Sequence, residues 1–229
     1  MNNRDYKLFA PNTFWHVFNR GNAKHDIFLD DEDYRFFLSR LKEYLYPPKA
    51  AFFLEDRLQG SQGSVVAESH TPYMRKGLPP ESFSLLSYAL MPNHYHFLIK
   101  QLAQVPISKL ISKVCTSYSK YFNKKYDRVG HVFQDKFKAV LVTNDSQLMW
   151  LSAYIHNNPK TAGLVEDLQG YQWSSYLDYM GLRQGTLCDK HFILKMFQGN
   201  IEAYQKFVEN SLEKTKELKD LENLLLDFP

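Results

Sequence analysis

The chain contains 229 residues, of which 44% are hydrophobic and 23% are charged, a composition typical of a globular protein with a core of its own. Two cysteines exclude a disulfide-stapled scaffold and a four-cysteine zinc site, and they fit a reducing compartment. No apolar run approaches the roughly 20 residues of a membrane span, and the first residues lack a signal-peptide core, so we expect a cytoplasmic protein with no membrane partner.

Segments with the hydrophobic periods of strands and helices alternate over the first two thirds of the chain. We predict strands at 13–20, 82–91, 94–101 and 137–143, and helices at 30–46, 106–126 and 144–157. The last helix is expected to stop before Pro159, because proline removes a helical hydrogen bond. The order β-α-β-β-α-β-α predicts an α+β protein with a ferredoxin-like antiparallel sheet and its helices on one face.

Two stretches are less regular than the rest. Residues 47–80 contain scattered glycine, serine and proline and are interpreted as a long excursion between two elements. Residues 185–229 contain an amphipathic pattern from Ile201 to Asp227. We therefore predict one domain over residues 1–184 and a helical C-terminal extension over residues 185–229.

The positive charge is concentrated in the middle of the chain. Between Lys100 and Val140 there are nine basic and two acidic residues, a local net charge of +7, although the whole chain carries only +3. A block of this kind indicates a polyanion as partner. A solvated helix face explains the same charge equally well.

His94 and His96 are separated by one residue on a predicted strand. Residues two apart on a strand project from the same face, so the two imidazoles lie side by side. Neutral imidazoles are good ligands for divalent metals, but most His-x-His pairs are structural, and a further ligand is needed. His16, on another strand, could be a third histidine near a metal, but packing on its strand is the favoured interpretation for one unpartnered histidine.

Tyr154 and Asn158 are four residues apart on a predicted helix and therefore share a face. An amide oxygen is a reasonable ligand for a hard cation, and a tyrosine beside a metal-bound phosphate can attack phosphorus. The same spacing also fits a core aromatic residue followed by an asparagine cap at the end of the helix.

Five segments together carry a family resemblance that covers residues 6 to 182. They are WHVFNRGN at 15–22, ALMPNHYHFLI at 89–99, FQDKF at 133–137, YIHNNP at 154–159 and WSSY at 173–176. In this order and spacing the chain resembles the HUH single-tyrosine transposases, and within them the REP-associated tyrosine transposases.

The resemblance implies a metal-dependent mechanism on DNA. His94, His96 and Asn158 would hold one Mg²⁺ or Mn²⁺, and Tyr154 would cut single-stranded DNA beside a hairpin through a 5′-phosphotyrosine intermediate. The tyrosines on the basic helix, Tyr118, Tyr121 and Tyr126, are not in the place of the nucleophile. It also implies a nucleoid-associated protein that works as a monomer or homodimer. Residues expected to contact DNA are Arg20, Asn22, Asn93, Lys120, Lys124, Lys136 and Lys138.

Two other functions remain open from the residues alone. The ferredoxin-like topology also occurs in sheet-based single-stranded nucleic-acid readers, so a non-catalytic binding module is an alternative. A small-molecule metal hydrolase is disfavoured, because such a site needs carboxylates and Asp127 is the only acidic residue from 82 to 134.

Overall fold

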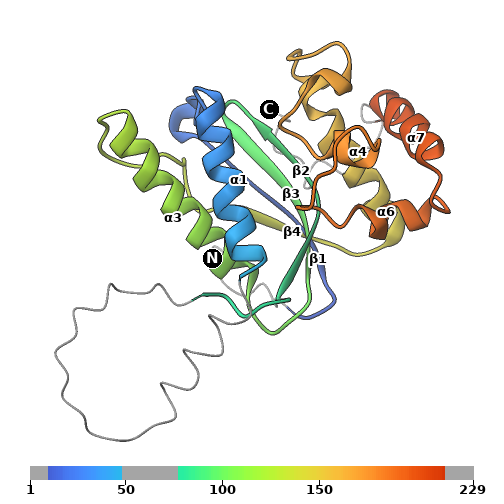
Figure 1. Cartoon of the computed structure of the whole chain (residues 1–229), viewed down its shortest axis with the longest axis horizontal. Coiled ribbons are helices and arrows are strands. Elements are labelled where there is room, and N and C mark those ends of the chain that lie inside the picture. The colour runs from blue at the N-terminus through green and yellow to red at the C-terminus, as the bar shows by residue number, and fades with distance from the viewer. Residues whose placement is uncertain (1–9, 48–76, 215–229) are drawn as a thin grey trace, which may run out of the picture.

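A four-stranded sheet lies at the centre of the computed structural model, which describes residues 10–47 and 77–214 (Figure 1). The sheet order is β2-β3-β1-β4, and every neighbouring pair is antiparallel. The strands are β1 (Phe14–Arg20), β2 (Phe83–Met91), β3 (His94–Gln101) and β4 (Lys138–Val142). The predicted α+β class and antiparallel sheet are confirmed. The structure adds that β1 and β3 are the central strands.

Two helices cover the first face of the sheet, α1 (Asp31–Leu45) and α3 (Ile107–Lys125). The side chains of Val17, Tyr95 and Phe97 point toward these helices and are fully buried among them. Helix α1 begins at a capping box in which Asp30 and Asp33 each accept from the other's backbone N–H.

Helix α4 (Asp145–Thr161) covers the opposite face, where it packs against Leu86 and Ala89 of β2 and Leu98 of β3. The prediction that the helices share one face therefore holds for α1 and α3 and is wrong for α4. Strand β2 is buried on both faces over nearly its whole length, so each face needs a cover. Helical periodicity predicts that a helix is buried but not which side of a sheet it takes.

Pro159 lies inside α4, which continues to Thr161 and is capped at Ala162. The expected stop before the proline is therefore wrong. Proline removes only the hydrogen bond to the carbonyl one turn earlier, and the helix resumes when Ala162 N–H donates to Asn158 O at 2.9 Å. Packing of the buried α4 surface outweighs that lost bond.

Further helical elements follow α4 and pack on the same side of the sheet. They are η2 (Leu168–Gly170), α5 (Tyr176–Tyr179), α6 (Lys190–Met196) and α7 (Ile201–Lys214), and the turn after β1 forms η1 (Asn22–Lys24). Helices α6 and α7 belong to the predicted extension and share one hydrophobic cluster with α4. Most of the expected excursion at 47–80, and residues 215–229 of the extension, lie outside the described residues.

A buried polar network ties α7 to α4. His156 is completely buried, with Nε2 2.7 Å from Ser175 Oγ and Nδ1 2.8 Å from the Tyr204 hydroxyl. Asn157 Nδ2 donates to Val208 O at 2.6 Å. Helix α4, which carries Tyr154, is thus fixed to α7 by hydrogen bonds as well as by apolar packing.

His156 predicts a specific loss of stability in acid. Burial lowers the pKa of His156 to about 3, whereas an unfolded histidine titrates near 6.5. Its stabilising contribution is therefore complete above about pH 6.5 and falls as the pH drops toward 3, by about 2 kcal/mol at pH 5. We therefore measure the free energy of unfolding by denaturant at about pH 7.5 and pH 5. Between these values it is expected to fall by about 2 kcal/mol less in His156→Gln than in wild type. Equal losses in both proteins would contradict this assignment.

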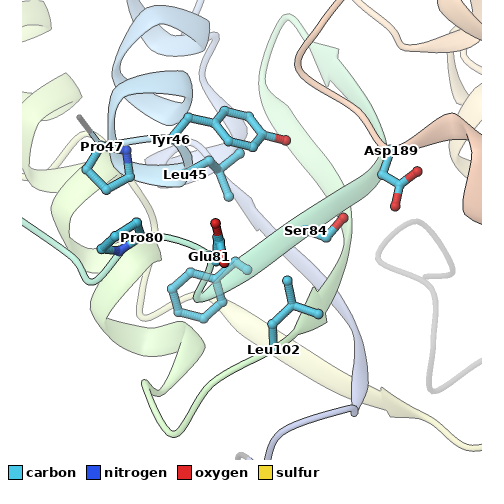
Figure 2. A pocket seen from close by; sticks show the side chains of 9 residues that line it. Leu45, Tyr46, Pro47, Pro80, Glu81, Ser84, Leu102 and Asp189 are labelled. Carbon is cyan, nitrogen blue, oxygen red and sulfur yellow. The ribbon is translucent and has the colours of Figure 1, made fainter. Parts of the chain in front are cut away.

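A cavity of about 400 Å³ opens at the end of the sheet where β2 begins and β3 ends. Its lining is largely apolar and includes Leu45, Phe83 and Leu102, with Asp189 at one side (Figure 2). The turn between β2 and β3, with His94, is at the opposite end of these two strands.

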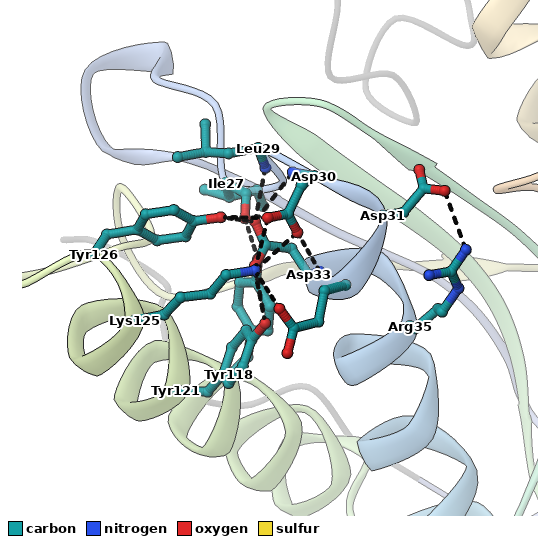
Figure 3. Close-up of polar contacts among 11 residues, drawn as sticks. Ile27, Leu29, Asp30, Asp31, Asp33, Arg35, Tyr118, Tyr121, Lys125 and Tyr126 are labelled. Carbon is teal, nitrogen blue, oxygen red and sulfur yellow. Dashed lines mark hydrogen bonds and ion pairs between the residues drawn. The ribbon is translucent and has the colours of Figure 1, made fainter.

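Lys125 joins the C-terminal end of α3 to the N-terminal end of α1 (Figure 3). Its ammonium lies 2.8 Å from Asp30, 3.0 Å from Glu32 and 3.0 Å from the buried Asp33. Tyr121 also receives a hydrogen bond from it at 3.1 Å. This lysine of the basic block is therefore engaged by carboxylates within the fold.

Candidate metal and nucleophile site

Strand β3 begins at His94, directly after the turn at Pro92 and Asn93. His94 and His96 project from the face covered by α4, as the strand period predicts, and their ring centroids are 5.0 Å apart at an interplanar angle of 88°. His96 is completely buried, and His94 is 9% exposed. Both imidazoles are therefore largely shielded from solvent.

Helix α4 places Tyr154 and Asn158 against the two histidines. Asn158 Oδ1 lies 3.4 Å from His94 Nε2, and the Tyr154 ring meets His96 edge-on with centroids 5.7 Å apart. Tyr154 is 8% exposed and stacks on Trp150. The alternative that Asn158 caps the helix is wrong, because the cap is at residue 162. The structure thus brings together four residues that are separated by up to 64 positions.

The donor set fits a small divalent cation. Two neighbouring ligand atoms of an octahedral Mg²⁺ are about 3 Å apart, close to the 3.4 Å between His94 Nε2 and Asn158 Oδ1. Burial, with His94 and His16 nearby, lowers the pKa of His96 well below its ordinary value, so this imidazole is neutral, as a ligand must be. Among the described residues no cluster of three or more His, Cys, Asp or Glu could hold a metal. A site here would therefore need the amide of Asn158.

His16 of β1 lies in the site, although the sequence reasoning favoured a packing role for it. Its Nε2 lies 2.9 Å from His96 Nδ1, and both side chains are completely buried. The residue does pack on its strand, with its ring centroid 4.7 Å from that of Phe18, but packing is only part of its environment. No local pattern could have found the contact, because it depends on the register between β1 and β3.

The turns beside the histidines bring three predicted DNA-contacting residues to the same end of the sheet. Asn93 Oδ1 lies 2.5 Å from His94 Nδ1, and its backbone carbonyl accepts from Gly21 N at 2.7 Å. Arg20 and Asn22 flank that glycine. Arg20 and Asn93 are partly buried, and Asn22 is exposed.

Gly21 is required by a close approach of two backbone segments. A Cβ atom at this position would lie 2.0 Å from the carbonyl oxygen of His25 and 2.8 Å from Ile27. No side chain fits there without moving the turn. The glycine of the Arg-Gly pair therefore sets how closely the turn after β1 packs beside the site.

The predicted DNA-contacting lysines fall into two groups. Lys136 and Lys138 are exposed at β4, and the Lys138 ammonium lies 5.9 Å from the ring centroid of Phe18, which in turn contacts His96. Lys120 and Lys124 are exposed on α3, which covers the other face of the sheet. The structure does not bring this second pair next to the histidines.

Comparison with known proteins finds one matching family model. Residues 52–158 match the family model described as "Transposase IS200 like". Over this segment the chain is therefore similar to the IS200-like transposases. The matched segment includes His94, His96, Tyr154 and Asn158, but not β1 with His16. No curated protein sequence matches the chain.

One solved structure shares the fold, and a second gives a weaker match. A REP-associated tyrosine transposase bound to a REP hairpin superimposes with a TM-score of 0.52 at 13% sequence identity, covering 80% of this chain and 92% of that one. A Deinococcus radiodurans R1 protein described as a transposase matches with a TM-score of 0.33 at 11% identity, over 67% of this chain and 96% of that one. Among the residues that the structure describes, no helix is both long and apolar enough to span a bilayer.

Proposed function

We propose that the protein is a metal-dependent transposase that cleaves and rejoins single-stranded DNA beside hairpins through a tyrosine–DNA intermediate. The observation that carries the proposal is the convergence of Tyr154, His94, His96 and Asn158 within an IS200-like transposase domain. The fold is also that of a REP-associated tyrosine transposase bound to a REP hairpin, which supports hairpin DNA as the substrate class.

His94, His96 and Asn158 would hold Mg²⁺ or Mn²⁺. Bound there, the cation supplies charge neutralisation at the scissile phosphate. The imidazole of His96 is kept neutral by burial, and Asn158 adds an oxygen without adding charge. The Asn93 side chain, 2.5 Å from His94 Nδ1, holds the ring of His94 so that Nε2 faces Asn158.

Tyr154 performs the covalent step. Its phenolic oxygen loses a proton and forms a bond to phosphorus, the bond from phosphorus to O3′ breaks, and the leaving O3′ takes up a proton. The products are a 5′-phosphotyrosine and a free 3′-hydroxyl. Attack by another 3′-hydroxyl reverses the step and rejoins two strands without ATP, because the phosphotyrosine conserves the phosphodiester bond.

The surface around the turn of β1 would position the DNA. Arg20, Asn22 and Asn93 lie near His94, with Lys136 just before β4 and Lys138 at its start. The DNA strand would therefore run along this end of the sheet. Lys120 and Lys124 on α3 would contact DNA extending beyond it. A monomer or homodimer, and association with the nucleoid, remain predictions.

An end-label experiment tests the chemistry. Purified protein is mixed with hairpin DNAs carrying single-stranded flanks, labelled at either the 5′ or the 3′ end, with Mg²⁺, Mn²⁺ or chelator. We expect a covalent adduct on a denaturing protein gel only with metal and only from the 3′-labelled DNA, because the tyrosine retains the 5′-phosphate of the downstream fragment. The 5′ label should appear in a shortened strand that ends in a 3′-hydroxyl.

The other outcomes separate the competing functions. Adduct from the 5′-labelled DNA would reverse the polarity of the step. Tight hairpin binding that is the same with metal and chelator, with no adduct from any labelled DNA including the gene's own flanks, would indicate the non-catalytic binding module instead.

A further inference from the structure

A histidine pair deep in the sheet joins β1 to the metal-binding strand. His16 and His96 lie diagonally across the β1–β3 ladder, where His16 pairs with Leu98 and Phe18 pairs with His96. Both strands are central in the sheet, and both histidines are completely buried. The relative position of the two rings is therefore fixed by backbone pairing rather than by mobile side chains.

The geometry is that of an in-plane hydrogen bond between the rings. The nearest nitrogens, His16 Nε2 and His96 Nδ1, are 2.9 Å apart, whereas the ring centroids are 5.2 Å apart. The planes differ by only 16°. Rings that are nearly parallel, with centroids much farther apart than their nitrogens, meet edge to edge, and the lone pair of a ring nitrogen lies in that plane.

This contact decides which nitrogen of His96 can bind a cation. His96 Nδ1 has His16 at hydrogen-bond distance and no room for an ion between them. Coordination must use Nε2, so the proton of the neutral ring must be on Nδ1. His16 must then accept that proton at Nε2 and carry its own proton on Nδ1. The opposite arrangement, with His16 donating, would put the proton of His96 on Nε2 and block coordination there.

We propose that His16 is a positioning residue, whose Nε2 accepts a hydrogen bond from His96 Nδ1 and thereby fixes His96 in the one tautomer and ring orientation that can bind the divalent cation. Both the tautomer and its role in metal binding are argued from the proposed function, but the tautomer is measured without metal or DNA. The contact also joins β1, which lies outside the segment that matches the transposase family model, to β3, which lies within it. His16 additionally lies against the Tyr154 ring, with centroids 6.2 Å apart, so the same side chain borders nucleophile and ligand.

The tautomer is measured directly in the metal-free protein. Long-range ¹H–¹⁵N spectra of histidine rings distinguish protonation at Nδ1 from protonation at Nε2. We expect His96 in wild type to carry its proton on Nδ1 and His16 likewise on Nδ1. A His96 proton on Nε2 would overturn the proposal, whatever the protein does to DNA.

Two substitutions test the consequence for the cation. His16→Leu introduces an apolar side chain of similar size and removes the acceptor, whereas His16→Gln places an amide oxygen where Nε2 was. Mn²⁺ titration followed by electron paramagnetic resonance should show affinity about 10- to 100-fold weaker in His16→Leu and largely restored in His16→Gln. Hairpin binding in chelator and thermal unfolding report whether both variants fold like wild type.

The outcomes separate this inference from the proposed function. Equal Mn²⁺ affinity in wild type and a folded His16→Leu would overturn the positioning role. Equally weak affinity in both variants would also overturn it, since it would mean that an acceptor at this place is not what His96 needs. Absence of Mn²⁺ binding in wild type, with the expected His96 tautomer, would instead refute the metal-dependent function and leave the hydrogen-bond assignment standing.

Discussion

Tyr154→Phe is expected to abolish the covalent adduct while leaving hairpin affinity within a few-fold of wild type. The substitution removes only the phenolic oxygen, so the ring still stacks on Trp150 and still meets His96 edge-on. Loss of a covalent nucleophile removes the reaction path itself, and the cleavage rate should fall by at least about 10⁴-fold. The measurement is single-turnover cleavage of labelled hairpin DNA, with adduct and strand product quantified together.

Tyr121→Phe is the matched control. Tyr121 is on the basic helix α3, which covers the other face of the sheet, and its hydroxyl bonds to Asp33 and Lys125 rather than to the site. Adduct yield in this variant should equal that of wild type. Cleavage by Tyr154→Phe with an adduct still present would place the nucleophile elsewhere, and adduct loss in the Tyr121 variant would direct the search to α3.

The strands and the first two helices were predictable because local pattern and tertiary role agree in them. Strand β1 is rich in aromatic residues and ends before the turn at Gly21, and α1 begins within one residue of its predicted start. Helix α4 shows the limit of this reasoning. Its buried surface extends almost all the way around, so the pattern gives neither the covered face nor the continuation through Pro159.

In the candidate site, too, local pattern predicted some features, whereas others depend on tertiary packing. The His94/His96 pair and the Tyr154/Asn158 pair each follow from a local period, so the sequence could propose both pairs. That the pairs meet, with Asn158 3.4 Å from His94, depends on the packing of α4 against β3. The contact of His16 with His96 depends on the register of two strands 80 positions apart, for which one sequence carries no signal.

His94→Ala is expected to give the second large loss, and the loss should match that caused by chelator in wild type. His94 is at the start of β3 and belongs to neither hydrophobic cluster, so truncation removes a ligand with little effect on the core. Asn158 Oδ1 and His96 alone leave too few protein ligands for a tight site. Cleavage should fall by about 10³-fold or more, as expected when charge stabilisation at the scissile phosphate is lost.

His191→Ala is the control, because His191 is exposed on α6 and remote in sequence from the ligand set. Mn²⁺ affinity and cleavage should be unchanged in it, whereas His94→Ala should lose both and still bind the hairpin in chelator. Asn158→Asp separates the role of the oxygen from that of the amide: a carboxylate keeps a hard ligand, so Mn²⁺ affinity should survive, while Asn158→Leu should lose it. If His94→Ala binds Mn²⁺ as tightly as wild type, the cation is held elsewhere and the His94, His96 and Asn158 set is not its site.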